Sequence, residues 1–188
     1  MSVLRRINAP NAAYFVTVCL PRRAELRLTD DLLAILAQAV DSARVRCDFH
    51  LLGYVFMPDH WHGLFAPLGE TTISDVLTPI KSSSGFHINR ALSRRGPFWE
   101  ARFYDHILRK SDDYRKVLNY MHHNPCAAGI AEHPGQWRWS SWQDYYAEGG
   151  PVGVDCAMLP RADDRPEQLP AAWRRGEGQW RLNRVGND

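Results

Sequence analysis

The chain of 188 residues is long enough for one domain with a real hydrophobic core, and its 45% hydrophobic and 23% charged residues are ordinary for a globular protein. No apolar run approaches the roughly 20 residues of a membrane span, and the N-terminus carries no signal-peptide pattern. We therefore expect a cytoplasmic protein with no membrane partner. The net charge of +2 does not by itself indicate a nucleic-acid binder.

Two further features of the composition restrict the function. The four cysteines form no CxxC pair, which argues against a structural zinc site and provides no disulfide framework. Of the 23 basic residues, 20 are arginine, whose fork suits phosphate recognition. A GC-rich genome would give the same excess of arginine, so the bias alone does not separate the two explanations.

Apolar periodicity and chain breakers predict seven elements in the order β-α-β-β-α-β-α. This order is typical of an α+β fold with a mainly antiparallel sheet and helices packed on its faces. Pro125 and Gly129 are expected to end the last helix. We expect one domain over residues 1–148 and a Pro/Gly/Arg-rich tail over 149–188 that is loosely folded or docks on the domain. The predicted strands cover 14–20, 50–57, 60–66 and 98–108, and the predicted helices cover 29–46, 71–92 and 111–124.

His60 and His62 are two residues apart in one of the predicted strands. Because side chains alternate along a strand, both imidazoles are expected on one face and Trp61 on the other. Two histidines on one face of a strand can supply two ligands to one metal ion. The same pattern is common among surface or hydrogen-bonded histidines, so by itself it leaves both interpretations open.

The last predicted helix brings further polar side chains to one face near its end. Tyr120 shares that face with His123 and Asn124, because residues three and four apart are neighbours on a helix. Either residue could be a third metal ligand, with Tyr120 directed at the same site. Tyr120 could equally be an ordinary half-buried residue, and Asn124 could end the helix, because Pro125 disfavours helical geometry at the preceding position.

Tyr120 beside a metal ion could act as a nucleophile on a phosphodiester. A phenol with a pKa of about 10 is a weak nucleophile at neutral pH, and an adjacent cation would stabilise the charge that develops on the phosphate. The attack gives a phosphotyrosine and a free hydroxyl, and this intermediate allows the strand to be rejoined without ATP. Two imidazoles and an amide oxygen suit Mn²⁺ better than Mg²⁺, although Mg²⁺ is more available.

Several motifs, in order, resemble the IS200-like single-tyrosine (Y1) HUH transposase family. Residues 54–62 (YVFMPDHWH) resemble its signature of two histidines around a bulky hydrophobic residue. Residues 98–106 (FWEARFYDH) and 114–129 (YRKVLNYMHHNPCAAG) resemble its strand after the middle helix and its nucleophile helix. Residues 137–142 (WRWSSW) resemble a segment of the subgroup associated with repetitive extragenic palindromes (REP). The resemblance covers roughly residues 5–146.

The resemblance implies a role for each residue of the site. His60 and His62 would be metal ligands, Tyr120 the nucleophile and Asn124 the remaining ligand, with His123 as its competitor. It also implies an HUH, ferredoxin-like fold and a divalent cofactor, Mg²⁺ or Mn²⁺. The implied substrate is single-stranded DNA next to imperfect hairpins, which is cleaved and rejoined through a covalent 5′-phosphotyrosine. The family contains monomers and homodimers. Because the subgroup is thought to be domesticated, resemblance to it does not imply transposition in the strict sense.

Binding to DNA is expected to rest on basic side chains that contact phosphates. Trp99 and Tyr104 could stack on unpaired bases, and Asp105 and His106 could support the metal ligands. The candidate phosphate contacts are Arg5, Arg6, Arg22, Arg23, Lys81, Arg90, Arg94, Arg95 and Arg102.

Two other functions fit parts of the pattern. A catalytically silent regulator that binds hairpin DNA would keep the fold and the basic surface but would not cleave. An unrelated metal enzyme with a water nucleophile would need His60 and His62 and would tolerate the loss of Tyr120. The presence of both histidines together with the tyrosine helix favours the tyrosine nuclease.

Overall fold

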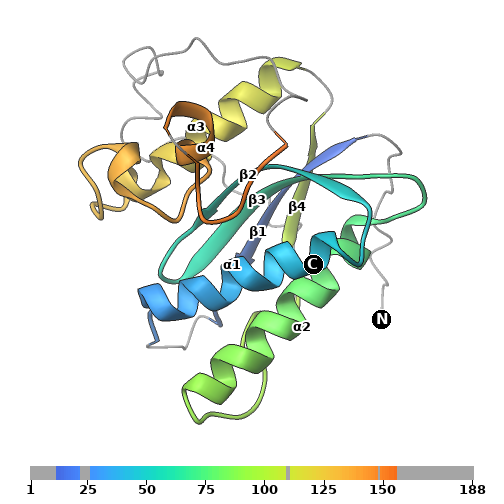
Figure 1. Cartoon of the computed structure of the whole chain (residues 1–188), viewed down its shortest axis with the longest axis vertical. Helices are drawn as coiled ribbons and strands as arrows, with labels where there is room; N and C mark the ends of the chain where they lie inside the picture. Colours follow the sequence, from blue (N-terminus) through green and yellow to red (C-terminus); the bar gives the residue numbers. More distant parts are fainter. Residues whose placement is uncertain (1–11, 22–25, 109–110, 148, 156–188) are drawn as a thin grey trace, which may run out of the picture.

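A four-stranded antiparallel sheet forms the centre of the structure (Figure 1). The computed structural model describes residues 12–21, 26–108, 111–147 and 149–155. The strands lie side by side in the order β2-β3-β1-β4, so β3 and β1 are central and β2 and β4 are edges. The strands are β1 (Ala13–Cys19), β2 (Phe49–Phe56), β3 (His60–Pro67) and β4 (Tyr104–Leu108).

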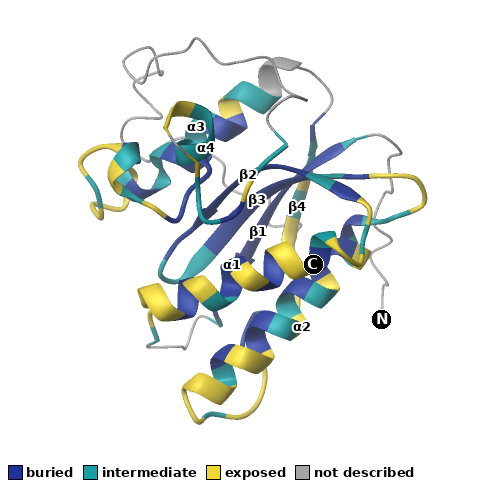
Figure 2. Ribbon diagram, viewed as in Figure 1, coloured by how far each residue is buried: buried dark blue, intermediate teal, exposed yellow. Residues whose placement is uncertain are grey.

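Helices cover both faces of this sheet. On one face, α1 (Asp30–Arg44) and α2 (Ile73–Ala91) lie side by side over the larger of two apolar cores, with their exposed residues turned outward (Figures 1 and 2). On the opposite face, α3 (Ser111–Ala127) packs over the second core. The short η1 (Pro134–Gln136) and α4 (Trp142–Tyr146) follow. The predicted element order and the α+β class are confirmed, and no described helix is long and apolar enough to cross a membrane.

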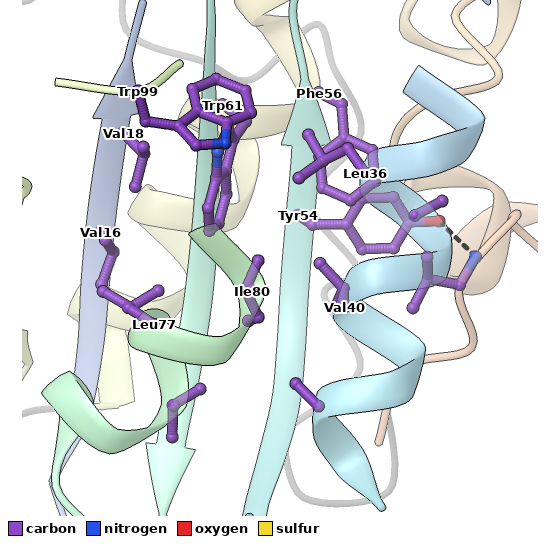
Figure 3. Close-up of a cluster of buried hydrophobic side chains, with 14 of the residues drawn as sticks. Val16, Val18, Leu36, Val40, Tyr54, Phe56, Trp61, Leu77, Ile80 and Trp99 are labelled. Atoms are coloured by element: carbon purple, nitrogen blue, oxygen red, sulfur yellow. Dashed lines mark hydrogen bonds between the residues drawn. The ribbon is translucent and has the colours of Figure 1, made fainter. Parts of the chain in front are cut away.

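Residue alternation in β3 divides its side chains between the two cores. Trp61 is fully buried in the larger core, with ring centroids 6.3 Å from Phe56 and 6.4 Å from Trp99 (Figure 3). Its neighbours in the sequence, His60 and His62, point to the face that α3 covers, as strand geometry predicts. The tryptophan therefore anchors the strand from one side while the histidines are presented on the other.

The strand predicted over 98–108 is wrong for its first six residues, because β4 begins only at Tyr104. The two bulky aromatic residues that start this segment are buried in the larger core as part of a loop. Lys81 Nζ donates to the backbone carbonyls of Glu100 and Ala101, at 2.8 and 3.0 Å. These carbonyls are satisfied by a lysine side chain rather than by a neighbouring strand, so an apolar pattern that reads as a strand forms a loop.

The last helix also continues further than predicted. α3 passes through Pro125 and reaches Ala127, so the expectation that Pro125 ends the helix is wrong. The missing proline N–H is tolerable so near the end, where few helical bonds remain to be made. As a consequence, Asn124 stays on the helix and lies one turn after Tyr120.

Gly129 provides the turn that leads away from this helix. Its φ of +70° is readily adopted only by glycine. The Gly129 N–H donates to the Cys126 carbonyl at 3.0 Å, and the Ile130 N–H donates to the Pro125 carbonyl at 2.9 Å. This is the Schellman pattern of helix termination, which satisfies the last carbonyls.

The close approach of α3 to β2 depends on Gly53. A Cβ atom at this position would lie 2.5 Å from Leu118 Cδ2 and 3.0 Å from Met121 Cε, both on α3. Gly53 also borders an irregularity in the register between β2 and β3. The missing side chain therefore lets the helix pack directly on the strand.

Residues 149–155, at the start of the predicted tail, pack on the domain. Val152 is buried, and its N–H donates to the Tyr54 hydroxyl at 3.1 Å. Asp155 accepts two hydrogen bonds from Arg44 Nη2, at 2.8 and 2.9 Å, and one from the Leu51 N–H at 2.9 Å. The remainder of the predicted tail, 156–188, lies outside the described residues.

Candidate active site

The two histidines of β3 lie between the sheet and α3. In the antiparallel register of β1 and β3, His62 is opposite Thr17. The ring centroids of His60 and His62 are 4.8 Å apart. His62 is buried and stacks on Phe15 with a centroid separation of 5.1 Å, whereas the side chain of His60 is 24% exposed. The pair therefore combines one solvent-accessible ring with one ring held inside the fold.

The hydrogen bonds of His62 determine which ring nitrogen carries its proton. Nδ1 lies 2.8 Å from Thr17 Oγ1, and Nε2 lies 3.2 Å from the side-chain nitrogen of Asn124. With the amide nitrogen of Asn124 facing it, Nε2 accepts, and the Nδ1–H is directed toward Thr17 Oγ1 and the backbone of Val16. Burial, and then the nearby His60, holds the pKa of His62 well below its ordinary value. The ring is therefore neutral, with its Nε2 lone pair directed toward α3.

His60 has the same arrangement through a different partner. Its Nδ1 lies 2.7 Å from Asp59 Oδ1, and a carboxylate can only accept, so Nδ1 carries the proton. The hydrogen bond from His60 is the main cause that lowers the pKa of the Asp59 carboxyl. The Nε2 atom of His60 is the ring nitrogen that Asp59 does not occupy, and the corresponding nitrogen of His62 faces Asn124.

Tyr120 lies next to the buried histidine. Its ring centroid is 5.5 Å from that of His62 and 6.0 Å from that of Phe15. Burial raises the pKa of the Tyr120 hydroxyl, and a hydrogen bond with the Asn124 side chain lowers it in part. The phenol is therefore protonated at neutral pH and must lose its proton before or during any nucleophilic attack.

Asn124 and His123, the two alternatives for a third ligand, have different surroundings. Asn124 contacts both His62 and Tyr120 through its side-chain amide. His123 Nδ1 instead donates to the backbone carbonyl of Asn119 at 2.9 Å, within its own helix. The structure thus brings Asn124, and not His123, into contact with the strand histidine.

This donor set fits a divalent cation. Two imidazole nitrogens and one amide oxygen are ligands that Mn²⁺ and Mg²⁺ sites use, with nitrogen favouring Mn²⁺. A rotation of the Asn124 amide turns its oxygen toward His62 in place of the nitrogen. Within residues 12–21, 26–108, 111–147 and 149–155, no group of three or more His, Cys, Asp or Glu side chains could hold a metal ion. The side-chain amide of Asn124 is a polar group that lies beside His62 and can supply an oxygen donor next to the two imidazoles.

Comparison with known sequences connects this site to a family. A sequence profile described as "Transposase IS200 like" matches residues 9–124, which include both strand histidines, Tyr120 and Asn124. The chain belongs to the IS200-like transposase family. The matched segment ends at the residue that the structure places beside His62.

Curated relatives of this transposase family are similar to the chain over most of its length. A REP-associated tyrosine transposase from Escherichia coli K12 is 27% identical over 150 residues, which are 79% of this chain and 87% of the relative. A relative from Haemophilus influenzae with a name of the same kind is 27% identical over 162 residues, covering 79% of this chain and 90% of that one.

A solved structure is similar to this chain in both fold and sequence. It shows a REP-associated tyrosine transposase bound to a REP hairpin, with 26% identity and a TM-score of 0.66. The match covers 76% of this chain and 84% of the other. The likeness agrees with the antiparallel α+β fold described above.

The predicted phosphate contacts fall into three groups in this transposase-family fold. Lys81, Arg90, Arg94 and Arg95 line one open groove beside α2. Arg102 is exposed two residues before β4. Trp99 is 5% exposed and its Nε1 donates to Ser84 Oγ, so it is a core residue and the prediction that it stacks on bases is wrong. The predicted contacts Arg5, Arg6, Arg22 and Arg23 lie outside the described residues.

The residues of β4 that were predicted to support the site lie on different faces. His106 is opposite Phe15 and Tyr104 is opposite Thr17, so both share the face of the histidine pair. Asp105 alternates to the other face, opposite Val16. Tyr104 is 43% exposed and remains available for contacts with a substrate.

The two acceptors that orient the histidines were not predicted from the sequence. Thr17 is the polar residue inside the apolar stretch YFVTVCL, which is a signal that sequence reasoning could have used. Asp59 directly precedes His60, but adjacency in the sequence does not tell whether its carboxylate turns toward the imidazole. Both roles depend on which nitrogen of each imidazole faces Thr17 or Asp59. That orientation is known only once the strands are paired in the folded structure.

Proposed function

We propose that this chain is a metal-dependent endonuclease and strand transferase that acts on single-stranded DNA next to hairpins. The observation that carries the proposal is the contact of Asn124 with both His62 and Tyr120, which places a candidate nucleophile beside the strand histidines. Membership of the transposase family and the similarity to a relative bound to a REP hairpin support hairpin DNA as the substrate.

His60, His62 and Asn124 would hold the divalent cation, Mn²⁺ or Mg²⁺. A bound cation supplies Lewis acidity, which stabilises negative charge on the phosphate oxygens during attack. The residues around it hold its ligands in place: Thr17 and Asp59 keep the Nδ1 protons on the two imidazoles, so that both Nε2 lone pairs are available. His123, bonded to its own helix backbone, takes no part in this set.

Tyr120 is the proposed nucleophile. Its Oη forms a bond to phosphorus while the bond from phosphorus to the 3′ oxygen breaks, which gives a 5′-phosphotyrosine and a free 3′ hydroxyl. The phenol loses its proton in this step and the 3′ oxygen gains one, so charge and atoms balance. Rejoining is the reverse reaction with a 3′ hydroxyl as the attacking group, and it needs no ATP because the phosphotyrosine retains the energy of the original bond.

The chemistry is assigned to the domain over residues 1–148. Arg90, Arg94, Arg95 and Arg102 are proposed to contact phosphates, together with Arg5, Arg6, Arg22, Arg23 and Lys81. The start of the predicted tail, residues 149–155, is proposed to dock on this domain, because Asp155 and Val152 form hydrogen bonds with α1 and β2.

The test is the formation of a covalent adduct. The protein is incubated with hairpin-flanked single-stranded DNA, taken from the repeats beside its own coding region, and with Mn²⁺ or Mg²⁺. We expect a protein–DNA adduct that resists denaturation and is absent in Tyr120→Phe, which keeps the ring and removes only the hydroxyl. Cleavage that persists unchanged in Tyr120→Phe would overturn the proposal, and metal-independent binding without any cleavage would indicate the silent regulator instead.

A further inference from the structure

An open groove lies on the face of the molecule away from the candidate active site. Its volume is about 820 Å³, and its walls are α2 and the loop that leads to β4. Trp99 lines the groove and packs against Trp61 from the larger core. Since Trp61 and His62 are consecutive in β3 and point to opposite faces, the groove and the histidine pair lie on opposite sides of the sheet.

The two walls of the groove are held together by hydrogen bonds and close packing. Lys81 spans it and donates to the carbonyls of Glu100 and Ala101 on the opposite wall. Gly85 lets that wall come close to α2, because a Cβ at this position would lie 3.2 Å from Phe98 Cβ. These hydrogen bonds and this close packing join the two walls of the groove, which reduces the ordering that binding requires.

The charge of the groove indicates what it binds. Its lining contains four cationic side chains and one acidic side chain: Lys81, Arg90, Arg94, Arg95 and Glu100. Arg90 and Arg95 are exposed, and the Arg94 guanidinium lies 5.4 Å from the centroid of the Phe98 ring. This excess of positive charge is complementary to a polyanion, and guanidinium groups match phosphate geometry.

Aromatic side chains narrow the choice of polyanion. Phe86 lines the groove and is 63% exposed, which leaves one of the most apolar side chains of α2 largely in solvent. Exposed rings beside arginines stack on the faces of unpaired bases, whereas a duplex keeps those faces inside its base stack. We propose that the groove between α2 and the loop over 94–103 binds the single-stranded DNA that flanks the hairpin.

β4 provides a route from this groove to the catalytic face. Phe103 lines the groove, and the next residue, Tyr104, is paired with Thr17 on the face of the histidines. Because Thr17 is in turn paired with His62, and neighbouring strands are about 4.8 Å apart, the backbones of Tyr104 and His62 are separated by roughly 10 Å. A strand that leaves the groove around the β4 edge thus arrives beside the proposed cleavage centre.

This inference rests on the proposed function for its substrate, so its test avoids cleavage. Binding is measured by fluorescence anisotropy with the full chain carrying Tyr120→Phe and without metal. The probes are an imperfect hairpin from the repeats beside the coding region, with its natural 5′ flank, with its natural 3′ flank, and with neither. A failure to cleave DNA in the earlier experiment leaves this measurement intact.

The decisive variants are Phe86→Leu and the double variant Arg90→Ala with Arg95→Ala, all at exposed positions. Phe86→Leu should weaken binding of a flanked hairpin by about 5- to 150-fold, the range for the loss of one stacked base. The double arginine variant should reduce the slope of log K against log salt by about 1.4, as two lost contacts to single-stranded phosphates predict. Phe86→Tyr and the exposed Arg46→Ala outside the groove are the matched controls and should bind as the parent does.

The probe without a flank separates the outcomes. We expect both groove variants to bind it with the affinity of the parent. Equal losses with and without flanks would place the hairpin stem in the groove, and no loss with either flank would remove the groove from DNA binding, so each result would overturn the proposal. Melting temperatures near that of the parent confirm that the variants are folded.

Discussion

Thr17 Oγ1 lies 2.8 Å from His62 Nδ1, and both side chains are buried between β1, β3 and α3. The two residues are 45 positions apart in the sequence and directly opposite in the strand register. The threonine hydroxyl lies beside the Nδ1 proton together with the backbone of Val16, and in the proposed site the other ring nitrogen would be the metal ligand.

Replacement of Thr17 should weaken metal binding without changing the ligands. Thr17→Val keeps the shape of the side chain and removes the hydroxyl acceptor, so the imidazole keeps only the backbone of Val16 beside its Nδ1 proton. We expect the affinity for Mn²⁺, measured by calorimetry on protein without DNA, to fall by about 10- to 100-fold. Thr17→Ser retains the hydroxyl and should bind close to the level of the natural protein. Unchanged Mn²⁺ affinity in Thr17→Val would show that the hydrogen bond has no such role.

Asn124 and His123 can be separated by parallel alanine variants. Asn124→Ala removes the amide beside His62. We expect the affinity for Mn²⁺ to fall by at least the roughly 10- to 100-fold expected for the loss of a residue that only orients a ligand, such as Thr17. Asn124→Ala should also abolish the covalent adduct. His123→Ala should retain both, because the ring is bonded to the Asn119 carbonyl within its helix. The opposite pattern, with His123→Ala inactive and Asn124→Ala active, would assign the third ligand to the histidine.

His122 should make the fold sensitive to acid. It is buried on α3, its Nε2 lies 2.9 Å from Ser141 Oγ, and burial, with a smaller effect of His123, lowers its pKa to about 3. The unfolded chain takes up this proton near its ordinary pKa of about 6.5, so the stabilising contribution is present above that pH and is lost as the pH falls toward 3. At pH 5 the loss from this residue alone should be about 2 kcal/mol.

The variant His122→Asn provides the measurement. It cannot titrate in this range, and its amide can still donate to Ser141. The free energy of unfolding, obtained from urea denaturation, should fall less between pH 7 and pH 5 in the variant than in the natural protein, by about 2 kcal/mol. The same dependence on pH in both proteins would mean that the acid sensitivity comes from other groups.

Asp155 should contribute to stability through the contacts that hold residues 149–155. In Asp155→Asn the side chain keeps its size and loses the charge that binds Arg44, and one oxygen acceptor becomes a donor facing the Leu51 N–H or the guanidinium. We expect a loss of about 1–3 kcal/mol in the free energy of unfolding, measured in urea. Asp48→Asn, at an exposed position directly before β2, is the control and should change stability by less than about 0.5 kcal/mol. Equal stability of the two variants would contradict the anchoring role.

The elements of the fold could be predicted because their apolar residues recur at the period of a strand or a helix. The loop over 98–103 could not, since a run of buried aromatics satisfies the pattern of a strand equally well. What decides between them is Lys81, almost 20 positions earlier, whose ammonium satisfies the loop carbonyls. A local pattern contains no information about such a distant partner.

In the candidate site, too, the residues given by local patterns could be predicted, and those that depend on distant partners could not. His60, His62 and Tyr120 could be selected because strand alternation and helix spacing are local rules. Thr17 could not be connected to His62, because the register between two strands is a property of the assembled sheet. Asn124 was placed in doubt by the preference of residues before proline, and the continuation of α3 to Ala127 outweighs that preference.

The contact between α3 and β2 at Gly53 gives the site a mechanical weak point. The helix that carries Tyr120 rests on a strand position without a side chain, and any methyl group there would press on Leu118 and Met121. The groove beside α2 lies on the other face and shares no residue with this contact. A substitution at Gly53 therefore acts on the helix that carries Tyr120 through the side chains of Leu118 and Met121, and it leaves the groove on the other face untouched.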